Sequence, residues 1–327
     1  MKALALLSGG LDSTLAVRII LDQGIDVEAL KFTSPFCQCD REGRCYSAEV
    51  AKELNIPIKT IAKGTDYIDI IKNPKHGYGS GINPCIDCRI YMLKKAKEYA
   101  GQTGAQFIFT GEVLGQRPMS QHRRALMTIE RESGLEGMLL RPLCAQYLPE
   151  TKAEKKGWVD RSKLFNITGR GRKAQYELAR KYDISSFSCP AGGCLLTDKN
   201  FARRMRDCIK YKKNITIRDI TMLKTGRHFR YNDSKIVVGR NENENEILRR
   251  YKNEYELMFL VPDIGSPITI LQESVDINSL HMAASITAAY SDALPGPVSV
   301  LYGTEENNFQ LLEVVKQEKK SIMQYNI

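Results

Sequence analysis

A short apolar run that ends in two glycines and leads into a second apolar segment constrains the fold of this chain most. Residues 4–17 read LALLSGGLDSTLAV. The run from Lys2 to Leu7 predicts a buried strand, and apolar residues at helical spacing from Leu11 to Leu21 predict a helix. Glycines let the backbone approach an anion closely, and the start of a helix presents free N–H groups and the positive end of its dipole. The stretch therefore predicts a strand–loop–helix unit that cradles phosphate, with an ordinary glycine turn capped by Ser or Asp as the alternative.

The residues within this loop narrow the kind of phosphate site. No Gly-Lys-Ser/Thr follows, which excludes a Walker loop, and the third glycine of the dinucleotide fingerprint is missing. Asp12 would repel a phosphate unless Mg²⁺ bridges the two. The segment SGGLDS resembles the PP-loop of the N-type ATP pyrophosphatases, which split ATP into AMP and pyrophosphate. It matches that motif at Ser8, Gly9, Gly10, Asp12 and Ser13.

Alternating strand and helix patterns set the fold class of the first half. Apolar runs at 27–32, 56–61 and 106–110 predict strands, and helical spacing at 48–54, 90–99 and 171–182 predicts helices. This alternation predicts an α/β fold, a parallel sheet with helices on both faces. The resemblance implies the same architecture, the adenine nucleotide alpha hydrolase-like fold, with ATP and Mg²⁺ as cofactors. In that family the adenine packs near the end of the second strand, here Lys31 and Phe32.

Beyond about residue 215 the pattern changes to short strands and turns. Residues 216–217, 235–238, 257–260 and 299–302 predict strands, and the NENENE stretch at 241–246 predicts a polar loop or the start of a helix. These patterns indicate a second, smaller α+β domain. We expect the first domain to span residues 1–212 and the second to span 213–327.

Charge, hydropathy and cysteine content limit the class of protein. The net charge is +10, and residues 150–250 hold 25 basic and 12 acidic residues, a local charge of +13. This favours a polyanion such as RNA as partner, with a solvated basic surface as the alternative. No apolar run approaches the roughly 20 residues of a membrane span, and the N-terminus does not resemble a secretory leader. We therefore expect a cytoplasmic protein with no membrane partner, in which the nine cysteines serve metal binding or sulfur chemistry rather than disulfides.

Four further motifs indicate which members of the PP-loop group the chain resembles. Residues 83–88 (NPCIDC) are similar to a stretch of the tRNA 2-thiouridylases, and residues 111–116 (GEVLGQ) and 141–143 (RPL) are similar to segments of the tRNA 4-thiouridine synthetases. Residues 188–194 (SCPAGGC) stand where those enzymes carry their later catalytic cysteine. By this resemblance the nucleotide site would also include Gly111, Gln116 and Arg141. Lys31 and Arg141 are candidates for phosphate contact, with plain surface charges as the alternative.

The cysteines Cys85, Cys88 and Cys194 leave three chemistries open. One thiol could carry a persulfide that another resolves, or three thiolates could hold a [4Fe–4S] cluster with an open iron that binds sulfide. A zinc ion could instead use four thiolates, with Cys189 as the fourth. Cys189 also competes with Cys194 as the third cluster ligand. The resemblance favours the cluster, because this chain shows no rhodanese domain to relay sulfur. Cys37, Cys39 and Cys45 form a second group that could be a metal knuckle or three loop thiols.

The second domain resembles the NFACT-R type of RNA-associated domain. The resemblance rests on residues 226–230 (GRHFR) and 235–241 (KIVVGRN, with VGRN at 238–241), on Asn245, and on the Pro-Gly turn at 294–297. A plain packing or dimerisation domain is the alternative. The resemblance implies an RNA-gripping role.

Together these features predict an ATP-dependent tRNA sulfurtransferase. A nucleobase carbonyl oxygen would be adenylated, with Asp12 serving the metal, and Cys85, Cys88 and Cys194 would deliver sulfur from sulfide or an external donor protein. Two other functions stay open: a PP-loop ligase or sulfur transferase for a small molecule, and a non-catalytic RNA-binding sensor of nucleotide or metal. The sequence also leaves a homodimer open.

Overall fold

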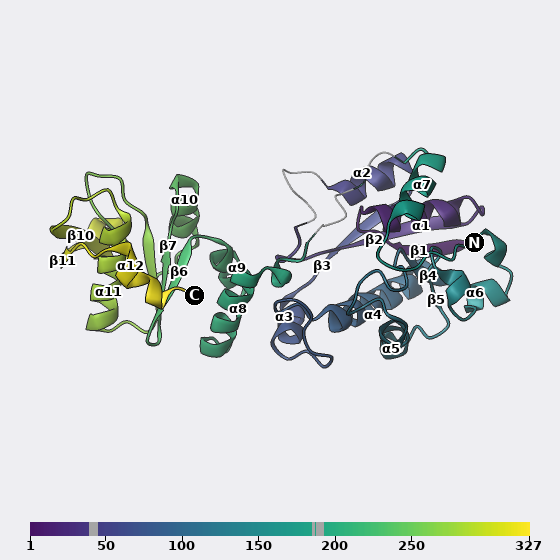
Figure 1. Cartoon of the computed structure of the whole chain (residues 1–327), viewed down its shortest axis with the longest axis horizontal. Coiled ribbons are helices and arrows are strands. Elements are labelled where there is room, and N and C mark those ends of the chain that lie inside the picture. Colours follow the sequence, from purple (N-terminus) through teal and green to yellow (C-terminus); the bar gives the residue numbers. More distant parts are fainter. Residues whose placement is uncertain (39–44, 185–186, 188–192) are drawn as a thin grey trace. The chain divides into compact units, whose positions relative to one another are not determined.

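The structure is a computed structural model that describes residues 1–38, 45–184, 187 and 193–327 (Figure 1). The chain forms two compact units, Met1–Asp198 and Lys199–Ile327, and each unit has its own sheet. Among the helices of the described residues, none combines the length and the apolar character that a bilayer crossing requires.

The N-terminal unit is built on a five-stranded sheet. Its strands are β1 (Lys2–Leu6), β2 (Asp26–Thr33), β3 (Ile58–Ala62), β4 (Phe107–Thr110) and β5 (Leu139–Leu140). They lie in the order β3-β2-β1-β4-β5, and every neighbouring pair is parallel. The order reverses between β1 and β4. In open parallel sheets, ligands bind outside the carboxyl ends of the strands at such a reversal.

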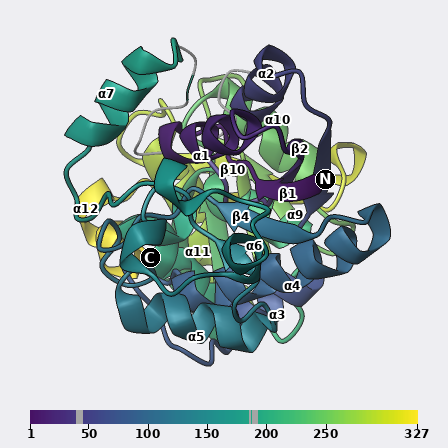
Figure 2. The same ribbon diagram turned by 90° about the vertical axis from the view of Figure 1, so that its right-hand side faces the viewer.

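Helices cover both faces of this sheet, which confirms the predicted fold class (Figures 1 and 2). One face carries α1 (Leu11–Leu21), α2 (Tyr46–Glu53) and α7 (Lys173–Lys181), and α6 (Lys152–Lys155) adds to the same core. The other carries α3 (Thr65–Lys72), α4 (Cys85–Thr103) and α5 (Arg123–Ser133).

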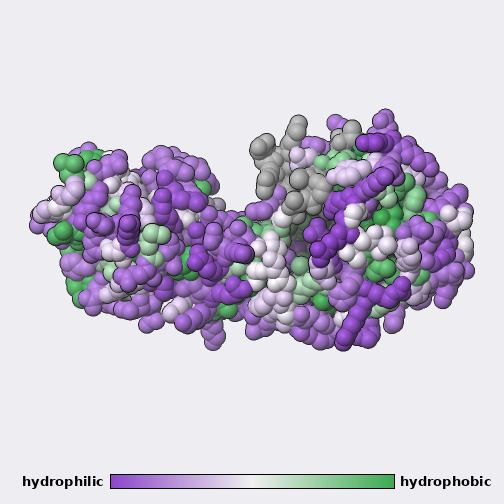
Figure 3. All heavy atoms as spheres, in the orientation of Figure 1, coloured by the Kyte–Doolittle hydropathy of each residue, from purple (hydrophilic) through white to green (hydrophobic). Residues whose placement is uncertain are grey.

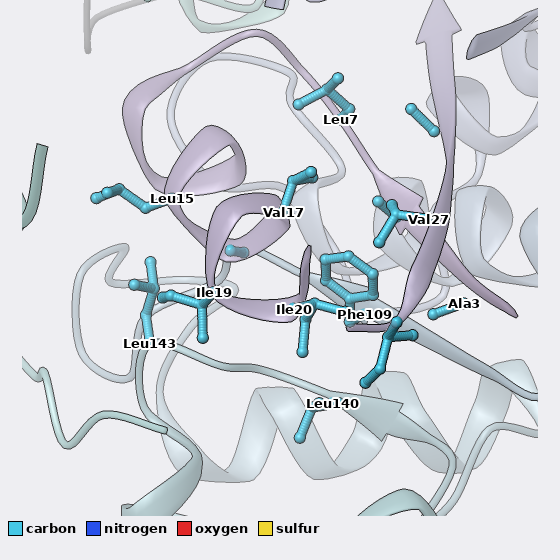
Figure 4. Packing of buried hydrophobic residues seen from close by; sticks show 14 of the residues in the cluster. Ala3, Leu7, Leu15, Val17, Ile19, Ile20, Val27, Phe109, Leu140 and Leu143 are labelled. Atoms are coloured by element: carbon cyan, nitrogen blue, oxygen red, sulfur yellow. The ribbon is translucent and has the colours of Figure 1, made fainter. Parts of the chain in front are cut away.

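Strand β1 supplies both cores of this unit because its side chains alternate between the two faces. Ala3, Ala5 and Leu7 pack with α1 in the first core, whereas Leu4 packs with α4 in the second. Figure 4 shows the first core, in which Leu15 and Ile20 of α1 lie with side chains of the sheet. Each such fully buried aliphatic side chain stabilises the fold by about 1.5–3 kcal/mol.

The sequence placed the CxxC pair just before a helix, and the structure corrects this. Helix α4 begins at Cys85, so that both cysteines lie within its first turns. Asp87, between them, accepts hydrogen bonds from the backbone N–H groups of Lys75 (3.1 Å) and His76 (3.0 Å). The residues from Cys85 to Arg89 are helical rather than a connecting loop, because Asp87 is satisfied by the preceding segment.

The C-terminal unit is a mixed unit with a six-stranded antiparallel sheet. The strands β6 (Arg227–Tyr231), β7 (Ser234–Val238), β8 (Leu257–Leu260), β9 (Thr269–Glu273), β10 (Pro297–Gly303) and β11 (Gln310–Val315) lie in the order β11-β10-β8-β9-β7-β6. The helices are α8 (Lys199–Tyr211), α9 (Ile217–Lys224), α10 (Glu242–Tyr251), α11 (Ile277–Tyr290) and α12 (Lys319–Ile322). The smaller α+β domain predicted from the sequence is thus present.

One local prediction in this unit differs from the structure, and for another the structure selects one of the two predicted forms, the start of a helix. Thr216 and Ile217 do not form a strand: the Thr216 side chain caps α9 and accepts a hydrogen bond from the Asp219 N–H. The NENENE stretch is the start of α10, since the Asn241 side chain accepts from the Glu244 N–H (3.0 Å). The two compact units meet at Asp198–Lys199, so helix α8 belongs to the second unit. The expected boundary at residue 212 lies after this helix instead of before it.

Gly239 and Asn245 fix the connection between β7 and α10. The Oδ1 atom of Asn245 accepts the backbone N–H of Ile268 (2.9 Å). A Cβ atom on Gly239 would collide with that same oxygen. A glycine is therefore required where the chain passes the Asn245 amide.

Candidate active site

The PP-loop occupies residues 7–10, between β1 and α1. Gly9 adopts a left-handed conformation (φ +76°), and a Cβ there would lie 2.6 Å from the Ser47 nitrogen at the start of α2. Ser13 Oγ donates to the Gly10 carbonyl (2.9 Å) and lies 3.1 Å from Ser8 Oγ. No side chain among the described residues caps α1 at Gly10. The first amides of α1 are therefore available to an anion.

Asp12 lies in the first turn of α1, partly buried. Arg172 Nη2 is 3.5 Å from its Oδ2 atom, and its Oδ1 atom is buried with no hydrogen-bond partner in the described part of the chain. Burial raises the pKa of the Asp12 carboxyl, while Arg172, Gln116 and Arg117 oppose that rise. An orphaned carboxylate oxygen beside a phosphate-type loop fits an oxygen ligand for Mg²⁺.

Gly111 holds the loop after β4 against the start of α1. A Cβ at Gly111 would lie 2.5 Å from the Ser13 nitrogen and closer still to the Asp12 carbonyl group. The backbones of the two predicted motifs, SGGLDS and GEVLGQ, therefore touch. Gln116 follows in the same loop, and its Nε2 atom is buried with no hydrogen-bond partner within the described residues. The same holds for both side-chain amide atoms of Gln175 on α7.

Arg141 supports this loop from inside the protein. It is 1% exposed, and its Nε atom is 3.1 Å from Oε2 of Glu112, while Nη1 bonds Glu130. Burial raises the pKa of the Glu112 carboxyl, but the charges of Arg141 and Arg89 outweigh this effect and hold the pKa below its ordinary value. The prediction that Arg141 contacts phosphate does not fit this environment, because both carboxylates enclose its side chain. Glu112 and Glu130 lie 29 and 11 residues away in sequence.

Arg117 links the PP-loop to the cysteine pair. It interacts with both Asp12 and Cys85, and burial together with its neighbours Arg89 and Arg172 lowers its pKa. Burial raises the pKa of the Cys85 thiol, and the same Arg89 and Arg117 counteract the rise. The CxxC pair therefore lies on the same edge of the sheet as the PP-loop.

A buried lysine holds the second thiol of the pair. Lys63 lies just after β3 and is 7% exposed. Its Nζ atom donates to Cys88 Sγ (3.0 Å) and lies 4.3 Å from the ring centre of Tyr67. Burial and the neighbouring Cys88, Cys194 and Cys37 all raise the pKa of the Tyr67 hydroxyl. Cys88 thus lies beside a buried lysine that also contacts a buried tyrosine.

Backbone pairing brings Cys194 to this place. Cys37 and Cys194 form an antiparallel bridge, flanked by the hydrogen bond from the Leu195 N–H to the Phe36 carbonyl (2.8 Å). The Ile82 N–H donates to the Leu196 carbonyl (2.9 Å), which joins the same segment to the stretch before Cys85. Burial raises the pKa of the Cys194 thiol to about 12.

These thiols do not form a ready metal site. Among residues 1–38, 45–184, 187 and 193–327, no three Cys, His, Asp or Glu side chains are grouped closely enough to hold a metal ion. Cys39 and Cys189 lie outside the described residues. The described geometry therefore supports Cys88 and Cys194 as neighbouring thiols, and it does not preassemble Cys85, Cys88 and Cys194 around a cluster or zinc.

The end of β2 carries a second lysine–thiol pair. Lys31 is 5% exposed, and its Nζ atom donates to Cys45 Sγ (3.0 Å) at the start of α2. Burial raises the pKa of the Cys45 thiol, but the hydrogen bonds from Lys31 and Ser47 outweigh this effect, so the pKa is lowered overall. Phe32, next to Lys31, packs on the second core. The roles of Lys31 and Phe32 at an adenine site stay predictions.

Sequence reasoning did not single out Lys63, Arg117 or Gln175. Lys63 immediately follows a predicted strand, as the PP-loop does, and Arg117 immediately follows the GEVLGQ motif. Polar residues just after buried parallel strands meet at one sheet edge, and this rule would have found Lys63 and Arg117. Gln175 carries no such signal, since it lies within α7.

The sheet order, the uncapped glycine loop and the adjoining thiols define a PP-loop α/β domain. Comparison with known families is more specific. Residues 1–148 match the family model described as thiamine biosynthesis protein (ThiI), and residues 226–326 match the model of the NFACT protein RNA binding domain. The resemblances inferred from the motifs of both domains are thereby confirmed.

Individual relatives have related descriptions. A "Probable tRNA sulfurtransferase" of Ureaplasma parvum serovar 3 is 32% identical over 153 residues, which cover 44% of this chain and 37% of the relative. The "tRNA-specific 2-thiouridylase MnmA" of Rippkaea orientalis is 25% identical over 238 residues, 69% of this chain and 64% of the relative. A 4-thiouridine synthetase solved with RNA and bound ATP has a TM-score of 0.37 and 22% identity, covering 68% of this chain and 52% of that one. The chain thus spans about a third of the length of the sulfurtransferase it matches.

Proposed function

We propose that the chain is an ATP-dependent sulfurtransferase that acts on tRNA. The observation that carries the proposal is that the loop after β4 contacts both motifs: Gly111 packs against the backbone of Asp12, and Oε1 of Glu112 lies 3.5 Å from Nε of Arg89, the residue after Cys88. A loop suited to the phosphates of ATP and a pair of thiols therefore lie at the same edge of the sheet. The names of the matching relatives and the RNA-binding description of the second domain support the same function.

The first half of the proposed reaction is adenylation. The phosphates of ATP lie on the amides at the start of α1, and Arg117 and Arg172 offset the charge of the leaving pyrophosphate. Asp12 holds Mg²⁺, which neutralises the same group when bound. A nucleobase carbonyl oxygen, in a base turned out of its stack, attacks the α-phosphorus. Pyrophosphate leaves, and the base oxygen becomes part of an AMP ester.

The second half replaces this oxygen by sulfur. In the persulfide form, the terminal sulfur of Cys88–S–S⁻ attacks the base carbon, and AMP leaves with the original oxygen. The Cys194 thiolate then attacks the Cys88 sulfur, which frees the thiocarbonyl base and leaves a Cys88–Cys194 disulfide for an external thiol to reduce. The Nζ atom of Lys63 donates a hydrogen bond to Cys88 Sγ (3.0 Å) and so holds this sulfur in place. A donor protein that carries a persulfide supplies the sulfur: the Cys88 thiolate attacks the donor's outer sulfur, and the donor leaves as a thiol. Sulfide alone can supply only the iron–sulfur form, because it would need a two-electron oxidant to become a persulfide.

The iron–sulfur form of the proposal assigns Cys85, Cys88 and Cys194 to a [4Fe–4S] cluster. It requires these thiols to move together, because the described residues hold no group of three metal ligands. Anaerobic reconstitution decides between the forms. Iron and sulfide that bind the wild type and are lost from Cys85→Ala, Cys88→Ala and Cys194→Ala support the cluster. Thiolation by iron-free protein supports the persulfide.

The decisive test uses single variants of the full chain with an unmodified tRNA transcript, ATP, and either sulfide or a persulfide-carrying donor protein as the sulfur source. We expect Cys88→Ala to bind ATP like the wild type but to make no thiolated nucleoside by mass spectrometry. Cys208→Ala, which alters a buried thiol of the second unit, is the matched control and should keep thiolation. Thiolation by Cys88→Ala at the level of this control would refute the assignment. ATP turnover to AMP that does not depend on RNA would favour the small-molecule alternative.

A further inference from the structure

Helix α8 carries an outward stripe of cations that neither family match covers. Lys199, Arg203, Arg206 and Lys210 follow one another at spacings of four, three and four residues, which puts them on one face of the helix. All four are exposed. The helix lies between residues 148 and 226, where the two matched regions end and begin. We call these four residues the α8 ridge.

The other side of α8 packs inside the unit and takes up the one acidic residue of the helix, so the only charges that remain on the exposed face are cations. Phe201, Ala202, Met205 and Cys208 are buried. The single acidic residue of the helix, Asp207, pairs with Arg230 (2.6 Å) and Lys235 (3.1 Å) of the sheet. Its charge is thus neutralised within the unit, and the ridge has no carboxylate on its own helix.

A comparison with α10 separates the ridge from an ordinary solvated face. The exposed side of α10 mixes signs, with Glu242 and Glu246 beside Arg249 and Arg250, and Arg249 Nη1 lies 3.5 Å from Glu242 Oε1. On α8 the exposed charges are all cations at helical spacing, and like charges at this spacing destabilise a helix. A bound polyanion would relieve that repulsion. In Figure 3, hydrophilic side chains cover much of the visible face of α8.

An exposed aromatic ring extends the ridge at its C-terminal end. Tyr211 is 36% exposed, and Lys210 Nζ lies 4.9 Å from its ring centre. The guanidinium of Arg230 lies 3.9 Å from the same centre. Cations that follow a backbone together with an aromatic platform are the usual components of a surface that binds single-stranded nucleic acid.

We propose that the α8 ridge is a docking surface for the phosphate backbone of RNA. The ridge runs over twelve residues, eleven steps of 1.5 Å or about 16 Å, so it can contact several successive phosphates. Such contacts supply affinity and orientation without reading base sequence. The proposal rests on the proposed function only for the choice of RNA as the polyanion, and it adds a binding surface outside the domain matched as RNA-binding.

The test compares two quadruple variants of the full-length protein. In the ridge variant, Lys199, Arg203, Arg206 and Lys210 all become Gln. In the control variant the four exposed lysines Lys152, Lys155, Lys156 and Lys163 become Gln, with the same charge change. The Lys152 N–H bonds the carbonyl of Gly137, which precedes β5, so the control helix α6 lies at the amino edge of the sheet, away from the PP-loop.

The probe is a fluorescently labelled, unmodified tRNA transcript, and the measurement is its Kd by fluorescence anisotropy at stepped KCl concentrations. We expect the ridge variant to bind about tenfold or more weakly, and its salt slope to fall by roughly three, because each lost phosphate contact removes about 0.7–0.9 from the slope. The control variant should stay within about twofold of the wild type, with its salt slope nearly unchanged, since its four lysines contact no phosphate under this proposal.

Two further measurements keep the outcomes separate. The ridge variant should melt close to the wild-type temperature, because all four side chains lie on the exposed face of α8, and its ATP affinity should be unchanged. Wild-type tRNA affinity and slope in the ridge variant would overturn the proposal, as would an equal loss in the control variant. Loss of tRNA binding by the ridge variant would support it even if no thiolated nucleoside were ever formed, so its outcome is independent of the proposed reaction.

Discussion

Gly111 offers a sharp test of the contact between the two halves of the candidate active site. In Gly111→Ala the new methyl group would lie 2.5 Å from the Ser13 nitrogen and against the Asp12 carbonyl. All of these are backbone atoms of the first turn of α1, so no side chain can rotate away. Overpacking of this kind costs about 1–3 kcal/mol. We expect a loss near 2 kcal/mol, and an ATP affinity weakened about tenfold because the amides of the loop are displaced.

Trp158 makes this effect measurable in the N-terminal unit alone. It is the only tryptophan of the chain and packs against the first core, so its fluorescence in a urea titration follows that unit. The matched control is Gly101→Ala in α4, where a Cβ meets no described atom within 4 Å. Alanine favours a helix over glycine by about 1 kcal/mol, so the control should be more stable. A Gly111→Ala protein with the wild-type urea midpoint and ATP affinity would refute the reasoning.

Three further predictions follow from particular contacts. Glu112→Gln should destabilise the N-terminal unit by about 3 kcal/mol, because it leaves the buried Arg141 without one of its two carboxylate partners. The pKa of Glu112 is held below its ordinary value despite burial, so the wild type should lose this stabilisation as the pH falls below about 4.3. Urea titrations from pH 6 to 3 should show a smaller loss of stability in acid for the variant than for the wild type. Iodoacetamide should label Cys45 at lower pH than an ordinary thiol, and Lys31→Met should move that profile to higher pH, as peptide mass spectrometry can measure; an unmoved profile would contradict the Lys31 assignment. Gly239→Ala should destabilise the C-terminal unit through Asn245 while the Trp158 transition stays in place, which circular dichroism and fluorescence recorded together can separate.

The fold was predictable where the signal is local. The strand, loop and helix from Lys2 to Leu21 follow from apolar periodicity and two glycines, and the structure places α1 at the predicted bounds. The start of α4 was not predictable in this way. It depends on Asp87 accepting two backbone N–H groups from residues 75 and 76, and no periodic pattern encodes that contact.

The candidate site also has a part that local sequence signals predict and a part that depends on tertiary contacts. The residue types of the PP-loop and the CxxC pair are visible in sequence, but their nearness depends on tertiary contacts, such as Gly111 against the backbone of Asp12 and Arg89 Nε at 3.5 Å from Glu112 Oε1. Arg141 illustrates a limit of motif reasoning. The resemblance of the RPL segment suggested a phosphate contact, whereas in the fold Arg141 pairs with two glutamates that are distant in sequence. Pairing of charges far apart in sequence is a tertiary property, which motif reasoning cannot supply.

The attachment of Cys194 has a dynamic consequence. Its segment joins the rest of the unit through backbone hydrogen bonds, among them Leu195 to Phe36, Gln38 to Gly193 and Ile82 to Leu196, and through the buried side chain of Leu196. Three such bonds contribute about 3 kcal/mol in all and the buried leucine about 2 kcal/mol, so the detached state would be populated on the order of once in several thousand molecules, more often than global unfolding. Amide hydrogen exchange should therefore be faster at Leu195 than in β1, and the third thiol can swing out to meet a donor while the sheet behind it stays closed.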